Sequence, residues 1–173
     1  METVKAPDSC PETVLERLIR ENEVSLKRLC YLTLHDETQA EDAVQETFLK
    51  AYRSLKDFRG EASEKTWLTR IALNTCRDML RSAWFRHTDR RVTVDMLPAA
   101  QEIRDPYHRE VTAAVMNLPG KLREVILLYY YRGLNMKEIA EVLKISQPAV
   151  TNRLKRARDK LRTELKGGGI DEE

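Results

Sequence analysis

The residues with the clearest chemistry lie near the C-terminus, where cationic and amide side chains recur at helical spacing. Apolar residues at positions 150, 154, 157, 161 and 165 would form the packed face of one helix. The exposed arc of that helix would carry Thr151, Asn152, Arg153, Lys155, Arg156, Arg158, Lys160 and Arg162. Arginine and lysine bind phosphates, and arginine and asparagine also hydrogen-bond base edges, so this arc has the chemistry of a DNA-binding surface. A solvated charged face without a ligand is the plainer alternative.

The segment immediately before this arc favours the DNA-binding alternative. A short helix is expected from Met136, with Asn135 as its N-cap and Glu138 closing a capping box, and Ser146 would cap the second helix. The small Ala140 would let the two helices approach closely, as a helix-turn-helix requires. In that motif the start of the second helix faces base edges in the major groove. We therefore expect base contacts from Thr151, Asn152, Lys155 and Arg156, and phosphate contacts from Arg153, Arg158 and Lys160.

A second basic stripe lies in the middle of the chain. Four polar residues fall at i, i+4, i+7 and i+11 on one face of a predicted helix: Arg70, Asn74, Arg77 and Arg81. Further cations extend the stripe at either end: Arg59, Lys65, Arg86, Arg90 and Arg91. Asparagine is unfavourable inside a helix, but its amide can bond a base edge. Nucleic-acid binding is therefore favoured over a solvated face here as well.

These surfaces need helices to position them, and the hydrophobic periodicity predicts an all-α protein without strands. Besides the helix-turn-helix, helices are expected over about 11–34, 38–55, 63–83, 105–118 and 119–132. The acidic second helix would turn Phe48 and Tyr52 inward. Periodicity is lost over 86–104, so a flexible linker would join two small helical domains at 11–85 and 105–166. The glycine-rich C-terminal tail is expected to be disordered.

The composition indicates a soluble cytoplasmic protein without membrane insertion. The 173 residues are 42% hydrophobic and 34% charged. The longest apolar run, 125–131, is far shorter than the roughly 20 residues of a membrane span, and the N-terminus lacks the regions of a signal peptide. The three cysteines, Cys10, Cys30 and Cys76, lack the spacing of a zinc site, so we expect free thiols in a reducing compartment.

The sequence gives little support for an enzyme. His35 lies beside Asp36 and Glu37, but no second histidine at helical spacing completes a metal site. No phosphate-binding loop, dinucleotide fingerprint or nucleophile motif is present. We therefore expect no catalytic residues, no cofactor and no bound metal.

Four motifs together resemble the extracytoplasmic-function (ECF) group of bacterial sigma factors, which belongs to the sigma-70 family. They are AEDAVQETFLKAYRSLKDFRG at 40–60, KTWLTRIALNTCRDMLR at 65–81, LPGKLREVILLYYYRGLNMKEIAEVL at 118–143 and AVTNRLKRARDKLR at 149–162. They cover nearly the whole chain outside the ends and the linker. Their order is far more specific than any one of them, since a helix-turn-helix alone is a weak signal.

The resemblance implies a subunit that directs RNA polymerase core to promoters, with region 2-like and region 4-like domains. Asp42, Gln45 and Glu46 would bind the clamp helices of the largest polymerase subunit, and the flap region is a further expected contact. The -10 element would be read as a single strand, with one flipped base at Asn74, by Arg59, Lys65, Arg70, Asn74, Arg77 and Arg81. The -35 element would be read as a duplex by Ser146, Thr151, Asn152, Arg153, Lys155, Arg156 and Arg158. The family also implies an anti-sigma factor as a partner.

Two alternatives stay open from the sequence. The family usually has glycine where this chain has Lys144, so the turn either holds a lysine at positive φ, at a cost of about 1 kcal/mol, or adopts a different corner. The alternative function is a stand-alone helix-turn-helix regulator of duplex DNA, whose N-terminal helices sense a signal or dimerise. That function leaves two features unexplained, the acidic second helix and the basic stripe that contains Asn74.

Overall fold

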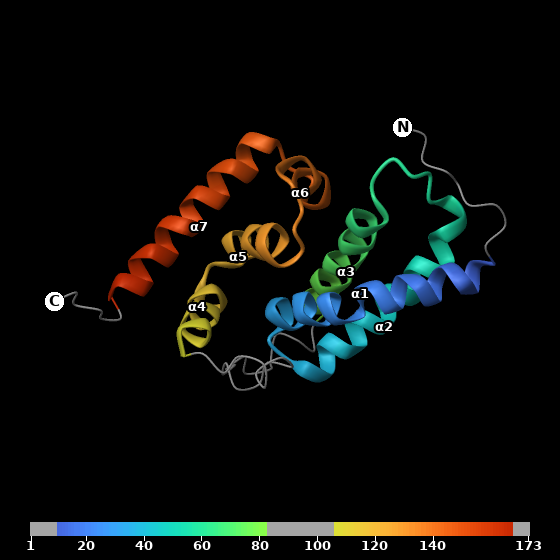
Figure 1. Cartoon of the computed structure of the whole chain (residues 1–173), viewed down its shortest axis with the longest axis horizontal. Helices are drawn as coiled ribbons and strands as arrows, with labels where there is room; N and C mark the ends of the chain where they lie inside the picture. The colour runs from blue at the N-terminus through green and yellow to red at the C-terminus, as the bar shows by residue number, and fades with distance from the viewer. Residues whose placement is uncertain (1–9, 83–105, 168–173) are drawn as a thin grey trace.

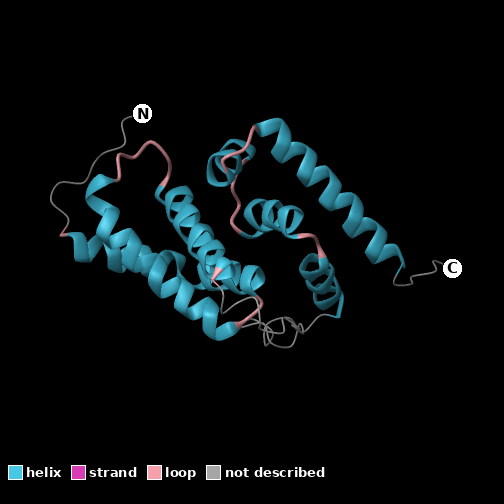
Figure 2. Ribbon diagram, turned by 180° about the vertical axis from the view of Figure 1, so that it is seen from behind, coloured by secondary structure: helices cyan, strands magenta, loops and turns pink. Residues whose placement is uncertain are grey.

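The computed structural model of the chain describes residues 10–82 and 106–167, and these residues form helices and loops without a strand (Figure 2). The all-α prediction is confirmed. The expected linker at 86–104 and the expected disordered tail lie outside the described residues.

The first half of the chain forms a three-helix unit, which we call the N-terminal module. It contains α1 (Pro11–Leu34), α2 (Glu37–Ser54), a short 3-10 turn η1 (Leu55–Asp57) and α3 (Glu64–Arg81). His35 ends α1 in the left-handed conformation, and Asp36 caps α2 by accepting the Gln39 N–H at 2.8 Å. Ser63 caps α3 by accepting the Thr66 N–H at 3.1 Å. The α2 and α3 ends lie within two residues of the predicted ones.

The core of this module follows the predicted apolar stripes. Leucines of α1, Phe48 of α2 and Leu68 of α3 are buried together. Trp67 is buried as well, and its ring centre lies 4.7 Å from that of Phe58. Tyr52, predicted to turn inward, is instead 38% exposed and donates its hydroxyl to Glu12 at 2.7 Å. A tyrosine at the edge of an apolar stripe can keep its polar tip in water, so periodicity alone does not place it.

The second half forms the C-terminal module. It contains α4 (Pro106–Asn117), α5 (Gly120–Ile126), η4 (Leu127–Tyr131), α6 (Met136–Leu143) and α7 (Gln147–Gly167). The predicted helix over 119–132 is not α-helical throughout, because η4 is a π-helical turn in which the Arg132 N–H reaches the Leu127 carbonyl at 3.0 Å. Apolar periodicity does not distinguish such a turn from the helix it continues. The chain then reverses at Gly133, which has φ 63°.

The two modules pack against each other. In Figure 1, α5 and α6 lie beside α3, while α7 lies on the outer side of the C-terminal module. Contacts join α3 to α6 and α1 to η4. The buried apolar side chains of both modules belong to one contiguous cluster. The two modules therefore share an interface. The polar contacts within it determine which side chains of each module stay exposed to solvent.

Candidate nucleic-acid interface

The helices α6 and α7 form the predicted helix-turn-helix. Asn135 accepts the Glu138 N–H at 3.0 Å while the Glu138 carboxylate accepts the Asn135 N–H at 2.8 Å, so the capping box is confirmed. Ser146 accepts the Ala149 N–H at 3.3 Å and thereby caps α7. Val150, Leu154 and Ala157 of α7 are buried, as the periodicity predicts.

The turn between these helices holds Lys144 at φ 54° and ψ 47°, in the left-handed region. The backbone N–H groups of Lys144 and Ile145 both bond the Ala140 carbonyl, which closes the end of α6. Of the two alternatives for this corner, the structure adopts the lysine at positive φ. The favourable interactions of the rest of the fold therefore offset the backbone strain at Lys144, which is about 1 kcal/mol.

Replacing Lys144 with glycine is expected to raise the free energy of unfolding by about 0.5 to 1 kcal/mol, because glycine adopts positive φ without a Cβ clash. Urea denaturation of both proteins measures the change. Lys137→Gly is the matched control, since Lys137 is exposed within α6 and glycine there should lower the stability by about 1 kcal/mol. A comparable loss in both variants would show that Lys144 carries no strain.

The predicted reading surface of α7 is exposed. We call it the α7 arc, and it comprises Thr151, Asn152, Arg153, Lys155, Arg156 and Arg158. Within it Arg153 is half-buried, while the other five residues are exposed. The Thr151 hydroxyl donates to the Gln147 carbonyl at 3.1 Å, so its remaining hydrogen-bonding capacity is that of an acceptor. Asn152, Lys155 and Arg156 therefore supply the donors near the start of the helix.

Arg158 has an aromatic partner that no sequence pattern predicts. Its Nε donates to the Tyr130 hydroxyl at 3.0 Å, and its guanidinium carbon lies 5.4 Å from the Tyr129 ring centre and 5.7 Å from that of Tyr130. Tyr130 is 56% exposed, which is unusual for a residue in so apolar a segment. The cation–π contact fixes the direction of an arginine expected to bind phosphate. No local signal links residues of η4 and α7, so only the fold shows this pair.

The second basic surface, which we call the α3 stripe, comprises Arg59, Lys65, Arg70, Asn74, Arg77 and Arg81. Asn74 is exposed, as are Arg59, Lys65 and Arg81, whereas Arg70 and Arg77 are half-buried. The helix therefore places the amide of Asn74 among cations at the surface. This arrangement suits a strand of nucleic acid, whose phosphates and bases would both be in reach.

Part of the α3 stripe contacts the C-terminal module. The Arg77 guanidinium binds the Glu124 carboxylate of α5 in a forked pair, with Nη2 at 3.0 Å and 3.1 Å from the two carboxylate oxygens and Nε at 3.2 Å from the first. Lys65 Nζ lies 3.5 Å from the position a Cβ would take on Gly133. The structure thus brings two predicted DNA contacts against the second module.

Arg132 enters the N-terminal module from the end of η4. It is 2% exposed, and its guanidinium donates to the Thr69 hydroxyl at 3.0 Å, to the Asn22 side-chain oxygen at 3.3 Å and to the Ser25 hydroxyl. Burial lowers the pKa of Arg132 to about 10, so the group stays protonated at neutral pH. All three side-chain acceptors are neutral. No motif or spacing in the sequence singles out Arg132.

The acidic face of α2 is available to solvent. Asp42 and Gln45 are exposed, and Glu46 is half-buried with its carboxylate 3.9 Å from Lys50 Nζ. An exposed pair at this distance contributes little to stability, so these side chains can exchange it for a partner at small cost. Asp42 also lines an open cavity of about 670 Å³ with Asp36, Gln39 and Asp78.

Two family models match the chain, one for each module. Residues 18–86 match sigma-70 region 2, and residues 108–161 match sigma-70 region 4. The RNA polymerase sigma-H factor of Pseudomonas aeruginosa is 34% identical over 140 residues, which cover 73% of this chain and 72% of the relative. The ECF sigma factor SigW of Bacillus subtilis is 31% identical over 153 residues, 80% of this chain and 82% of SigW. The chain belongs to the ECF group of sigma-70 factors.

Solved structures of other sigma factors share the fold. CnrH, in complex with the cytosolic domain of CnrY, is similar with a TM-score of 0.70 and 30% identity over 91% of both chains. RpoE of Bartonella quintana, in complex with the anti-sigma factor NepR, has a TM-score of 0.68 at 24% identity, over 91% of this chain and 99% of RpoE. A promoter-recognising sigma factor accounts for both modules, whereas a stand-alone regulator accounts only for the second.

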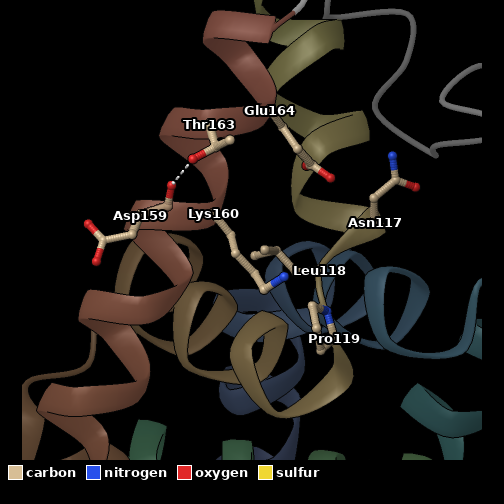
Figure 3. A pocket seen from close by; sticks show the side chains of 7 residues that line it. All are labelled: Asn117, Leu118, Pro119, Asp159, Lys160, Thr163 and Glu164. Carbon is tan, nitrogen blue, oxygen red and sulfur yellow. Dashed lines mark hydrogen bonds between the residues drawn. The ribbon is translucent and has the colours of Figure 1, made fainter.

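A further hollow of this sigma factor lies where the α4–α5 junction meets the end of α7. It has a volume of about 390 Å³ and is lined by Asn117, Leu118, Pro119, Asp159, Lys160, Thr163 and Glu164 (Figure 3). Thr163 donates to the Asp159 carbonyl at 3.0 Å, and the charges around the hollow are of both signs. Nothing in it resembles a nucleophile with an adjacent base.

The described residues contain no metal-binding cluster and no membrane-spanning helix. Over 10–82 and 106–167, no group of three His, Cys, Asp or Glu side chains could hold a metal ion. No helix within these ranges is both long and apolar enough to span a bilayer. Cys10 is exposed, while Cys30 and Cys76 are buried, and all three thiols are free.

Proposed function

We propose that this sigma factor directs RNA polymerase core to promoters by reading two elements in two states of the DNA. The single observation that carries the proposal is the presence of two basic reading surfaces, the α3 stripe and the α7 arc, on modules that match regions 2 and 4. The chain acts by binding and positioning, without catalytic chemistry of its own. It acts in the cytoplasm, where its polymerase is.

The α3 stripe reads the -10 element as a single strand. Asn74 supplies an amide that can both donate to and accept from a flipped base, while the arginines around it bind phosphates of the strand. Unstacking a base costs a few kcal/mol, which the contacts of the flipped base and the cations offset. The exposure of Asn74 supports this role.

The α7 arc reads the -35 element in the major groove of the duplex. Ser146 and the residues of the first turns lie at the end of the helix that enters the groove. Asn152, Lys155 and Arg156 contact bases, and Arg153 and Arg158 contact phosphates. The Tyr130 contact holds Arg158 in place for a phosphate.

The acidic face of α2 binds the clamp helices of the largest polymerase subunit, and the C-terminal module meets the flap region. Asp42, Gln45 and Glu46 are accessible on one helix, which supports a contact with a basic protein surface. An anti-sigma factor regulates the chain. CnrH with the cytosolic domain of CnrY and RpoE with NepR are relatives of the fold bound to such partners or partner domains, which supports this expectation.

Reversing the charge of Asp42 and Glu46 together to lysine is expected to weaken binding to core polymerase by about tenfold or more, because attraction becomes repulsion at a charged interface. Fluorescence anisotropy of labelled sigma factor titrated with core measures the affinity. Glu16→Lys with Glu23→Lys is the matched control, since both residues are exposed on α1 and the charge change is the same. Unchanged affinity of the α2 variant would reject this contact.

The function as a whole is tested by transcription in vitro. Core polymerase with and without this chain transcribes genomic DNA, and sequencing of the transcript starts reports the promoters. Starts that depend on the chain and share two upstream elements are expected. A chain that binds duplex DNA tightly but never binds core would instead be a stand-alone regulator.

A further inference from the structure

Tyr130 of η4 and Arg158 of α7 form an exposed pair beside the helix-turn-helix. The Arg158 Nε donates to the Tyr130 hydroxyl at 3.0 Å, and Tyr130 is 56% exposed. We propose that these two side chains together bind one phosphate of duplex DNA, so that the DNA surface of the C-terminal module extends beyond the helix-turn-helix to η4. That the phosphate belongs to promoter DNA rests on the proposed function, whereas the geometry of the pair does not.

The π-helical turn η4 displays this tyrosine within an otherwise apolar segment. Leu127 and Leu128 are buried, and Tyr131 is half-buried against the core, whereas Tyr130 faces solvent. The Arg132 N–H bonds the Leu127 carbonyl five residues back, at 3.0 Å, in the pattern that defines a π turn. Single π turns of this kind are frequent at functional sites, where they re-aim a side chain. Here the side chain is aimed at α7.

The hydrogen bond between the two residues leaves donors for an anion. The Tyr130 oxygen accepts from Arg158, so the proton of the same hydroxyl remains available for donation. The bond uses the Nε–H of Arg158, and the N–H groups on Nη1 and Nη2 are separate from it. A phosphate presents several acceptor oxygens and can therefore accept from the hydroxyl and the guanidinium at once.

Two aromatic rings hold the Arg158 guanidinium in one direction. Its central carbon lies 5.4 Å from the ring centre of Tyr129 and 5.7 Å from that of Tyr130. The two rings meet edge to face, with their centres 4.9 Å apart. An aromatic ring attracts a cation without neutralising it, so the positive charge stays available to an anion. A side chain held in this way also loses less conformational freedom on binding than an unrestrained arginine.

The pair lies in line with residues that the proposed function assigns to bases. Thr151, Lys155 and Arg158 occur at i, i+4 and i+7, so they form one stripe along α7, and all three are exposed. A helix rises 1.5 Å per residue, which places Arg158 about 10 Å along the axis from Thr151. The major groove is about 12 Å wide, so a helix whose first turns meet bases brings Arg158 towards the phosphates at the groove edge. Tyr130 reaches the same edge from η4.

Neutralising single phosphates of the duplex tests this site directly. In duplexes that carry the upstream promoter element, one phosphate at a time is replaced by a neutral methylphosphonate, and fluorescence anisotropy measures the affinity of the polymerase holoenzyme. We expect one position at which this change weakens binding of the native chain by about fivefold. A scan without any such position would overturn the site.

Two variants connect that phosphate to the pair. Tyr130→Phe keeps the ring and removes the hydroxyl, while Arg158→Gln removes the charge. Each should bind the unmodified duplex about fivefold more weakly and lose most of its sensitivity to that one phosphate. A Tyr130→Phe variant with native affinity and native sensitivity at every phosphate would overturn the shared site and leave Tyr130 a structural residue.

The salt dependence of binding separates the roles of the two side chains. Loss of a cation from a phosphate lowers the slope of log K against log salt concentration by about 0.9, because fewer counterions are released. Arg158→Gln should show this decrease, while Tyr130→Phe should weaken binding with an almost unchanged slope, since a hydroxyl is neutral. The double variant should lose less affinity than the product of the two single losses, because both groups act on one phosphate. Fully multiplicative losses would overturn the shared site.

Matched controls carry the same chemical changes at nearby positions. Tyr131→Phe removes a hydroxyl from the same π turn, at a residue that packs against the core, and Lys166→Gln removes a charge from the exposed end of α7. Both should bind DNA as the native chain does. Tyr130 and Arg158 are exposed, so their variants should keep the fold, which circular dichroism checks. Losses in the controls equal to those in the variants would overturn the assignment to this pair.

Transcription in vitro distinguishes a failure of this site from a failure of the proposed function. Transcription by the native chain, together with native DNA binding by Tyr130→Phe and Arg158→Gln, would overturn the site alone. If the chain directs no transcription, the same phosphate scan is made with the free chain and a duplex that it binds. The one-phosphate effect in that scan would leave the site intact while the proposed function is refuted, and a chain that binds no duplex would overturn both.

Discussion

Reversing the charges of Lys155 and Arg156 to glutamate should abolish recognition of the upstream promoter element. Each residue is exposed near the start of α7, where a recognition helix meets base edges. Losing one good base contact costs about 1 to 3 kcal/mol, and the new carboxylates also repel phosphates. The combined loss is expected to exceed about a hundredfold in affinity.

Footprinting of the polymerase holoenzyme on a promoter found by transcript sequencing measures this effect. Protection upstream should vanish, while binding to core polymerase stays as it was. Lys166→Glu is the control for charge, because it lies on the same helix about 15 Å beyond Arg156 and is exposed. If Lys166→Glu weakens the footprint as much as the double variant, the loss reflects general electrostatics, and α7 reads no bases.

Replacing Asn74 with alanine should reduce the formation of open promoter complexes by about tenfold, which corresponds to about 1.4 kcal/mol of lost hydrogen bonding to a flipped base. Initial binding to the closed duplex should be almost unchanged, because the amide meets its base only after the strands separate. Permanganate reactivity of unpaired thymines measures opening, and a filter-binding assay at low temperature measures the first step.

Asp78→Ala separates this effect from a general change in α3. Asp78 is exposed one turn beyond Asn74, and a carboxylate is not a phosphate ligand. The control variant should therefore open promoters as the native chain does. If Asn74→Ala weakens both steps equally, the amide stabilises the duplex complex rather than the flipped base, and the division of labour between α3 and α7 is wrong.

Part of the α3 stripe lies against the C-terminal module, where Arg77 binds Glu124. Asn74 is exposed, so its replacement leaves the Arg77–Glu124 pair in place. A defect of Asn74→Ala is therefore a defect in DNA contact and not a change in the packing of the two modules.

Local interactions explain why so much of the helical framework follows from the sequence. Asn135 and Glu138 are three residues apart, and so are Ser63 and Thr66, so each cap can be recognised within one turn. The corner at Lys144 is different, because the sequence left two alternatives open and only the structure shows the lysine at positive φ. Periodicity does not predict the π-helical turn at Leu127–Tyr131, because its apolar residues fit either kind of helix.

The sequence by itself determined the helices, their caps, the helix-turn-helix and the two basic surfaces, because periodicity and capping act over a few residues. Only the tertiary structure decided what those surfaces face. Arg132 reads as an exposed cation at a helix end, yet its partners Thr69 and Asn22 lie 63 and 110 residues away in the chain. Arg77 and Glu124 are 47 residues apart, and Arg158 and Tyr130 are 28 apart. Such contacts depend on how whole helices pack, which no local pattern in the sequence specifies.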